Sequence, residues 1–185
     1  MTGASGDLWV FGYGSLMWQP GFDHVERHIA VLDGHRRSFC LRSIRYRGTP
    51  ESPGLVLGLD PQPGARCMGV AYRVSAPHVA AVRDYLRERE LVTYAYHEAW
   101  LPVRLDTGSE VTALSFVVDR HHPQYAGALD LAAQAAVIAS ANGPRGSNRE
   151  YLVNTLEHLA ACGIEDAELD ALGALVAERM GSSGR

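Results

Sequence analysis

The sequence predicts an α+β fold, in which strands come first and helices gather towards the end of the chain. Short runs rich in valine, leucine and aromatic residues, separated by turn residues, fill most of the first 118 positions. Helical patterns dominate from position 128 onward, and only one interrupts the strands. The regular strand–helix alternation of a parallel α/β sheet is therefore missing.

Seven runs are predicted to be strands, because they combine β-branched, leucine and aromatic residues over lengths typical of strands. Turn clusters such as Asp60–Gly64 and Asp106–Gly108 separate some of them. The predicted strands are Leu8–Tyr13, Ile29–Asp33, Arg37–Ile44, Leu55–Asp60, Met68–Val74, Ala95–Leu105 and Thr112–Val118.

Four segments are predicted to be helices. The first begins at Ser75, with Pro77 in its first turn, and runs to about Glu90. An alanine-rich helix follows over Ala128–Ala141 and is stopped by the Asn142-Gly143-Pro144 sequence. Ser147 and Glu150 form a capping box for a helix that ends near Gly163, and a last helix covers Asp166–Met180.

Length and composition predict one domain. The chain has 185 residues, of which 46% are hydrophobic and 21% charged, as in ordinary globular proteins. We expect a single domain over residues 8–180, flanked by Gly/Ser-rich disordered tails at 1–7 and 181–185. The net charge of −4 argues against a nucleic-acid or membrane-surface partner. The composition implies no obligate protein partner.

The cysteines predict a cytoplasmic protein. Cys40, Cys67 and Cys162 form an odd set without a C-x-x-C pair, which favours reduced thiols over a disulfide framework. The start of the chain lacks the features of a signal peptide. The most apolar stretch, Ala128–Ala141, is too short to span a bilayer.

A glycine-rich segment, Gly12–Trp18, follows the first predicted strand directly. Glycines allow a sharp turn and expose backbone N–H groups, which can bind a carboxylate or an oxyanion. Met17 stands where the dinucleotide-binding motif needs its third glycine, and the chain has no lysine for a P-loop. The segment therefore matches neither the dinucleotide-binding motif nor the phosphate-binding P-loop. The remaining alternative is a tight turn between two strands.

Glu90 is a candidate general acid/base. It lies four residues beyond Leu86, on the same helical face as the apolar stripe of Val79, Val82 and Leu86. Burial and the negative end of the helix dipole should both raise its pKa, which suits a group that takes up and returns a proton. The alternative is a structural ion pair with Arg87, Arg89 or another arginine.

Two further segments could supply polar groups. The stretch His35–Thr49 carries five arginines and no acidic residue, and Arg47 is the best placed to meet an anionic substrate. The alternative is a solvated strand edge. Asn148 and Tyr151 follow a glycine-rich loop at a predicted helix N-terminus, where anions are favoured, although capping alone would explain this segment.

The histidines do not predict a metal site. His24 and His28 are four residues apart, but they lie in a loop or strand and lack the zinc-protease glutamate position. His121 and His122 are adjacent and cannot easily chelate one ion. We expect no metal and no cofactor.

Four segments, in order along the chain, resemble the signature motifs of one family, the ChaC group of γ-glutamylcyclotransferases. They are Trp9-Val10-Phe11-Gly12-Tyr13-Gly14-Ser15-Leu16-Met17-Trp18; Arg47-Gly48-Thr49-Pro50 with Pro53-Gly54; Tyr85-Leu86-Arg87-Glu88-Arg89-Glu90 with Tyr94; and Gly143-Pro144 with Gly146, Asn148, Tyr151 and Leu152. The chain departs from the family pattern in two places. Val92-Thr93 replaces a frequent Gly-Gly pair, and Tyr46 stands where histidine is common.

The resemblance implies a γ-glutamylcyclotransferase-like mixed β-barrel core with surrounding helices. It implies a cofactor-free lyase that cleaves glutathione to 5-oxoproline and cysteinylglycine, as a step of glutathione catabolism. Glu90 would be the catalytic acid/base. The residues expected to bind substrate are Gly12, Tyr13, Gly14, Ser15, Leu16, Met17, Arg47, Tyr94, Asn148 and Tyr151.

Three alternatives to this function stay open at the level of sequence. The first is a cyclotransferase for other γ-glutamyl amino acids or amines. The second makes Ser15 the nucleophile of a hydrolase, although the G-x-S-x-G motif is absent. The third is a non-catalytic regulator of a cation transporter, which a glutamate on an apolar helix face disfavours.

Overall fold

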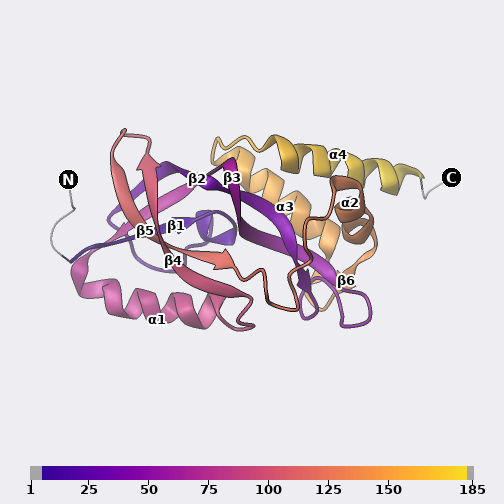
Figure 1. The fold of residues 1–185 in the computed structure, drawn as a ribbon, viewed down its shortest axis with the longest axis horizontal. Helices are drawn as coiled ribbons and strands as arrows, with labels where there is room; N and C mark the ends of the chain where they lie inside the picture. The colour runs from indigo at the N-terminus through magenta and orange to yellow at the C-terminus, as the bar shows by residue number, and fades with distance from the viewer. Residues whose placement is uncertain (1–5, 183–185) are drawn as a thin grey trace. The chain divides into compact units, whose positions relative to one another are not determined.

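The computed structural model describes residues 6–182, and the chain divides into two compact units (Figure 1). The first unit holds the chain up to Arg37 together with Leu59–Asp119. The second holds Ser38–Gly58 and the chain from Arg120 onward. The division falls within two long strands, and the expected single domain over 8–180 stays a prediction.

Five strands form a closed barrel, which confirms the α+β barrel fold that the sequence predicts. Their order around the barrel is β1-β3-β2-β4-β5, with an additional pairing of β3 with β5. The strands are β1 (Leu8–Gly12), β2 (Glu26–Ser43), β3 (Gly54–Val74), β4 (Tyr96–Leu105) and β5 (Glu110–Val118).

Two strands are longer than the sequence predicts. Ile29–Asp33 and Arg37–Ile44 belong to one strand, β2, and Leu55–Asp60 and Met68–Val74 both belong to β3. Each strand contains one glycine at positive φ, Gly34 at 77° and Gly64 at 79°. A glycine in this conformation lets a strand bend without ending, as at a β-bulge, so turn residues do not mark a strand end here.

The register of the first unit fixes where β1 ends. This strand runs antiparallel to β3, with Leu8 opposite Val74 and Gly12 opposite Val70, and parallel to β5 through Trp9 and Ala113. β1 therefore lies between two strands and delivers Gly12, with the loop that follows it, at its carboxyl end.

Helix α1 (Val79–Glu90) packs against the strands of the same unit and follows a short 3₁₀ turn, η2 (Ala76–His78) (Figure 1). Its buried residues Val82 and Leu86 join one apolar cluster with residues of β1 and β5 and with the loop residue Leu16. The cluster also includes Leu8, Val10, Val74, Leu114 and Phe116. The predicted apolar stripe therefore sets which face of α1 is buried.

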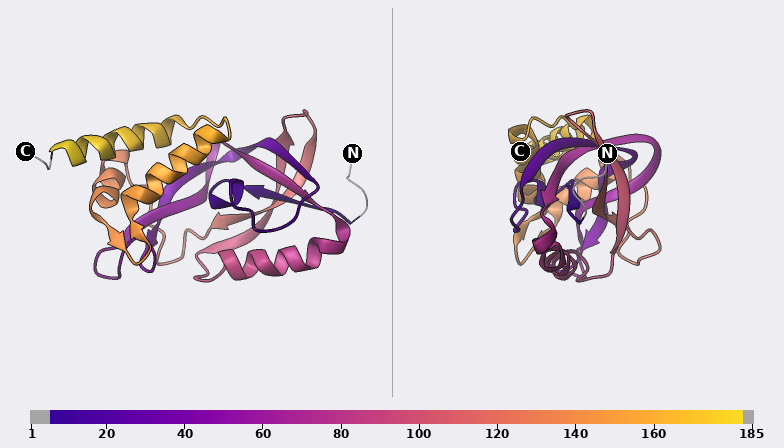
Figure 2. Two further views of the ribbon diagram at one scale, coloured as in Figure 1. Left: turned by 180° about the vertical axis from the view of Figure 1, so that it is seen from behind. Right: turned by 90° about the vertical axis from the view of Figure 1, so that its left-hand side faces the viewer.

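The second unit contains helices α2 (Leu131–Ser140), α3 (Asn148–Ala161) and α4 (Ala167–Ser182), which pack against one another (Figure 2). Asp130 caps α2 by accepting a hydrogen bond from the Ala133 amide at 2.7 Å, so α2 begins three residues later than predicted. Ser147 caps α3 as predicted, accepting from the Glu150 amide at 3.1 Å. Between them, β6 (Asn142–Gly143) and β7 (Gly146–Ser147) form a small hairpin.

The tails expected at 1–7 and 181–185 lie mostly outside the described residues. Within the described range, Asp7 pairs with Arg73 at 2.6 Å, and helix α4 continues to Ser182. Among the described residues, no helix is long and apolar enough to cross a membrane.

Candidate active site

Glu90 is the last residue of helix α1 and lies one turn beyond the fully buried Leu86. Its side chain keeps only 19% of its surface exposed, and its Oε1 lies 3.3 Å from Arg89 Nε. Burial raises the pKa of the Glu90 carboxyl above its ordinary value, and the Arg89 charge only partly offsets this rise. The sequence left two alternatives for Glu90, a buried acid/base and an ion pair with an arginine. The structure has features of both, since Glu90 is desolvated and also has Arg89 as a neighbour.

The segment Gly12–Met17 leaves the barrel at the end of β1 and closes in one 3₁₀ turn, η1 (Ser15–Met17). The Met17 amide donates to the Gly14 carbonyl at 2.9 Å, and the Gln19 amide donates to the Ser15 carbonyl at 2.8 Å. The amides of Ser15 and Leu16 open this turn and, as in any helical turn, have no carbonyl partner within it. Such amides can bind an anionic oxygen.

Glycine is required at the base of this loop because of close packing. A Cβ at position 12 would lie 2.9 Å from the Leu16 Cβ, and a Cβ on Gly69 of β3 would lie 2.3 Å from the Gly12 carbonyl oxygen. The loop backbone is therefore pressed onto the barrel wall. Neither contact requires a positive φ, so close approach explains these glycines.

Two side chains that sequence reasoning did not assign to the site anchor the same loop. Arg37 is buried, and it donates through Nε to the Tyr13 carbonyl at 2.6 Å and through Nη2 to the Met68 carbonyl. The Tyr72 hydroxyl donates to the Met17 carbonyl at 2.6 Å. The sequence offered one signal for Arg37, because strand periodicity places it on the same face as Phe39 and Leu41.

Within the first unit, Arg89 brings the loop and Glu90 together. Its Nη2 donates to the Ser15 hydroxyl oxygen at 2.8 Å, while its Nε pairs with Glu90. The predicted loop and the predicted acid/base are thus joined by one side chain. Arg89 is part of the family motif, but the motif alone does not indicate which residues Arg89 contacts.

Tyr94 lies in the same unit, in the segment that follows α1. It is 77% exposed and adopts φ of 56°, a left-handed conformation that is unusual for a residue other than glycine. Val92, which replaces a glycine common in the family, is also exposed. A substrate contact for Tyr94 stays a prediction.

The second unit brings Arg47, Asn148 and Tyr151 together. Arg47 Nη1 donates to the Ser147 carbonyl at 3.3 Å, and its guanidinium carbon lies 5.5 Å from the centre of the Tyr151 ring. Arg47 also pairs with Glu150 at 3.4 Å. These contacts join the Arg47–Pro50 motif to the start of α3.

Asn148 is completely buried and holds β3 to α3. Its Oδ1 accepts from the Leu55 amide at 2.6 Å, and its Nδ2 donates to the Leu55 carbonyl at 2.7 Å. This arrangement favours a bracing role for Asn148 over direct substrate contact. Gly143 fits the same explanation, because a Cβ there would lie 2.4 Å from the Tyr46 carbonyl oxygen.

The histidines considered above have other contacts. His28 lies between Asp106 at 2.9 Å and Glu26 at 3.3 Å. Among residues 6–182, no group of three or more His, Cys, Asp and Glu side chains is placed to hold a metal ion.

Comparison with known proteins gives consistent results. The family model described as ChaC-like protein matches residues 8–179. The glutathione-specific gamma-glutamylcyclotransferase of Escherichia coli strain K12 is 38% identical over 167 residues, which cover 90% of this chain and 71% of that protein. The enzyme of the same name from Schizosaccharomyces pombe is 36% identical, with 84% of this chain and 85% of that protein covered.

A solved structure shows the same architecture. The crystal structure of the yeast gamma-glutamyl cyclotransferase specific to glutathione superimposes with a TM-score of 0.83 at 26% identity. The match covers 94% of this chain and 97% of the yeast chain. The likeness therefore extends over both compact units and is not confined to one motif.

Proposed function

This chain belongs to the ChaC-like protein family, and on that premise we propose that it is a γ-glutamylcyclotransferase that cleaves glutathione to 5-oxoproline and cysteinylglycine. The observation that carries the proposal is the position of Glu90, a desolvated carboxylate at the end of α1, tied through Arg89 to the loop Gly12–Met17. Arg89 thus links a proton-transfer group to a loop whose backbone amides can bind an anionic oxygen.

The proposed reaction is intramolecular. The α-amine of the γ-glutamyl group attacks its own γ-carbonyl, so one C–N bond forms in the five-membered ring while the bond to the cysteinyl nitrogen breaks. The atoms of glutathione are all found in the two products, and no water is consumed. Holding amine and carbonyl in contact contributes up to about 7–11 kcal/mol in ideal intramolecular cases.

Glu90 would carry the proton between the two nitrogens. The substrate amine is an ammonium near neutral pH, and it becomes a nucleophile only after losing a proton. The ionised Glu90 takes this proton and then delivers it to the departing cysteinyl nitrogen. Because burial raises the pKa of Glu90, its carboxylate is a stronger base than an exposed glutamate.

The loop would supply the electrostatic part of catalysis. The turn amides of Ser15 and Leu16 are candidates to hold the oxyanion that develops at the γ-carbonyl, or the α-carboxylate of the substrate. Arg37 and Tyr72 hold the carbonyls of Tyr13 and Met17, on either side of these two amides, before substrate arrives. This pre-organisation is what a transition-state site requires.

Glutathione is favoured over other γ-glutamyl compounds by the names of the relatives and by the Arg47–Pro50 motif. Substrate contacts of Arg47, Tyr94, Asn148 and Tyr151 stay predictions from the family motifs. A cytoplasmic location is part of the proposal, and the odd set of three cysteines without a C-x-x-C pair supports it.

The experiment is to incubate the purified protein with glutathione and identify the products by mass spectrometry. The proposal expects 5-oxoproline and cysteinylglycine in equal amounts, and their loss in Glu90→Gln. Preferential turnover of γ-glutamyl-alanine would keep the mechanism and change the substrate. Release of free glutamate would contradict the cyclisation, and no turnover of any γ-glutamyl compound would favour a non-catalytic role.

A further inference from the structure

We infer that Arg89 is a positioning residue for the reaction: it fixes the Ser15 hydroxyl as a hydrogen-bond donor to the substrate and holds the loop beside Glu90. The inference rests on the proposed function, because it assigns this role at the same site. It concerns side chains of the first unit alone.

The geometry of Arg89 is that of a tether between two segments. Nη1 donates to the Gln19 carbonyl at 2.7 Å, to the Pro20 carbonyl at 3.2 Å and to the Tyr85 hydroxyl at 2.9 Å. Nη2 donates to Ser15 Oγ at 2.8 Å. One guanidinium on α1 therefore holds both ends of the turn between Ser15 and Pro20.

The chain closes tightly around this guanidinium. Gly21 has a φ of 75°, and a Cβ at this position would lie 2.0 Å from the Tyr85 hydroxyl oxygen. The segment after Pro20 is therefore fitted to Tyr85, which itself accepts a hydrogen bond from Arg89. A lysine could not replace these contacts, since it offers a single point of charge instead of a planar fork.

The bond to Ser15 has a definite direction. Arginine carries only donors, so Ser15 Oγ is the acceptor and its own proton points elsewhere. The positive charge also polarises the hydroxyl, which strengthens it as a donor. A serine in this state is suited to an anionic oxygen, either the substrate α-carboxylate or the oxyanion at the γ-carbonyl. It is equally unsuited to act as a nucleophile, because none of residues 6–182 accepts a hydrogen bond from its hydroxyl.

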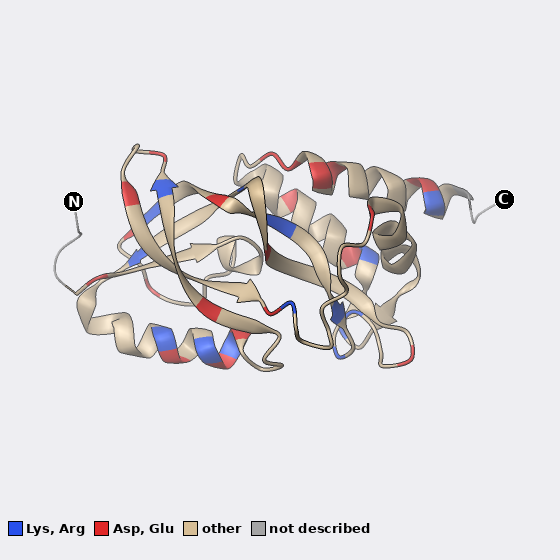
Figure 3. Ribbon diagram, viewed as in Figure 1, with Lys and Arg blue, Asp and Glu red and all other residues tan. Residues whose placement is uncertain are grey.

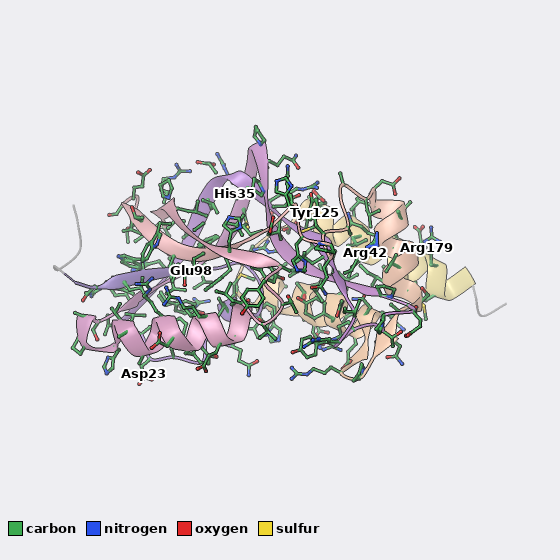
Figure 4. The ribbon with its side chains drawn as sticks, turned by 60° about the horizontal axis from the view of Figure 1, so that its bottom comes forward. Asp23, His35, Arg42, Glu98, Tyr125 and Arg179 are labelled. Carbon is green, nitrogen blue, oxygen red and sulfur yellow. The ribbon has the colours of Figure 1, made fainter. Side chains whose placement is uncertain are left out.

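Arg89 also acts on Glu90. The other charged groups on α1 or packed against it are engaged away from Glu90. Arg87 pairs with Glu98 of β4, whose place beside α1 is labelled in Figure 4, and Arg83 Nη2 lies 3.5 Å from the same carboxylate. Asp84 and Glu88 are exposed. Figure 3 shows that helix α1 carries basic and acidic residues side by side. Among the described residues, Arg89 supplies the charge that opposes the effect of burial on Glu90.

The test is a double-mutant cycle with a matched control. Arg89→Gln removes the charge and most of the fork, Ser15→Ala removes the hydroxyl, and Arg87→Gln removes a neighbouring charge on the exposed face of α1. Arg89→Gln should lower kcat/KM about 100-fold and Ser15→Ala about 10-fold, whereas Arg87→Gln should change it less than about 2-fold. In the Arg89→Gln background, Ser15→Ala should cost less than about 2-fold more, because the hydroxyl is already misdirected.

Two further measurements keep the inference testable if activity or folding fails. Amide hydrogen exchange of residues 14–19 and the titration of the Glu90 carboxyl by ¹³C NMR require no substrate. Arg89→Gln should speed exchange in this turn and shift the Glu90 titration to higher pH, while Arg87→Gln should change neither. Arg89→Lys, which keeps the charge, should speed exchange but leave the titration near that of the wild type. If Arg89→Gln does not fold, Arg89→Lys takes its place in the cycle with Ser15→Ala.

The outcomes separate the two proposals. Wild-type protein without cyclotransferase activity contradicts the proposed function, but exchange and titration results would still decide the role of Arg89. The inference would be overturned if the effects of Ser15→Ala and Arg89→Gln on kcat/KM simply multiply in the double mutant. It would also be overturned if Arg89→Gln changed neither the hydrogen exchange of the loop nor the Glu90 titration.

Discussion

Replacing Glu90 with glutamine perturbs the proposed proton transfer while leaving the shape of the site intact. An amide neither accepts the ammonium proton nor returns one to the leaving nitrogen. Loss of a general acid/base lowers kcat by about 10²–10⁴-fold. The loop should stay in place, because Arg89 keeps its bonds to Ser15, Gln19, Pro20 and Tyr85.

Stability should change little in the same variant. Glutamine removes a carboxylate that is desolvated, which is favourable, and also removes its ion pair with Arg89, which is unfavourable. Both side chains keep about a fifth of their surface exposed, at 19% and 21%, so solvent screens the pair. We expect a net change within about 1 kcal/mol.

The assay compares kcat, glutathione affinity and unfolding free energy for wild type and Glu90→Gln. Affinity is measured by calorimetry, where the inactive variant allows binding to be followed without turnover. The expected result is a large loss of kcat with affinity and stability preserved. A variant that retains more than about a tenth of the wild-type rate would refute the assignment of Glu90 as the proton carrier.

Three other predictions concern pH dependence, core packing and independence from metal ions. Burial raises the pKa of Glu90, so the folded protein keeps its proton to higher pH than the unfolded chain. Stability should therefore fall as pH rises through the raised pKa, and activity should fall as pH drops through it. Glu90→Gln should remove the Glu90 contribution to the pH dependence of stability, which urea unfolding at several pH values measures. Leu86→Ala, at a position with 0% exposure, should destabilise the protein by about 2–5 kcal/mol in the same assay. Treatment with EDTA should leave the rate of 5-oxoproline formation unchanged, and loss of activity that zinc restores would contradict this.

The order and type of the elements could be predicted from sequence because periodicity and turn residues are local signals. The stripe of Val79, Val82 and Leu86 predicted both α1 and the buried side of the helix on which Glu90 lies. Strand lengths were less predictable, because Gly34 and Gly64 bend β2 and β3 where the sequence suggested ends. Whether a glycine ends a strand or bends it depends on the pairing of that strand with its neighbours, which is a tertiary property.

Only the parts of the candidate site that have local sequence signals were predictable. Glu90 and the loop Gly12–Met17 have local signals, namely a carboxylate on an apolar face and a run of glycines. Tyr72 and Arg89 have no such signal, and strand periodicity indicates only the buried face for Arg37. The importance of all three lies in bonds to backbone groups that are distant in sequence. Asn148 shows what the motif alone does not indicate, because its amide bonds to the distant Leu55 backbone. Its contact with substrate stays a prediction.

The central claim is that the substrate's own amine is the nucleophile, and the identity of the products tests it most directly. Glutathione and N-acetyl-glutathione are each incubated with the protein in water enriched in ¹⁸O, and the products are identified by mass spectrometry. The account predicts unlabelled 5-oxoproline from glutathione and no reaction of the N-acetyl compound, whose blocked nitrogen cannot attack. Glutamate carrying ¹⁸O, or cleavage of N-acetyl-glutathione, would show that water or an enzyme side chain is the nucleophile and would contradict the account.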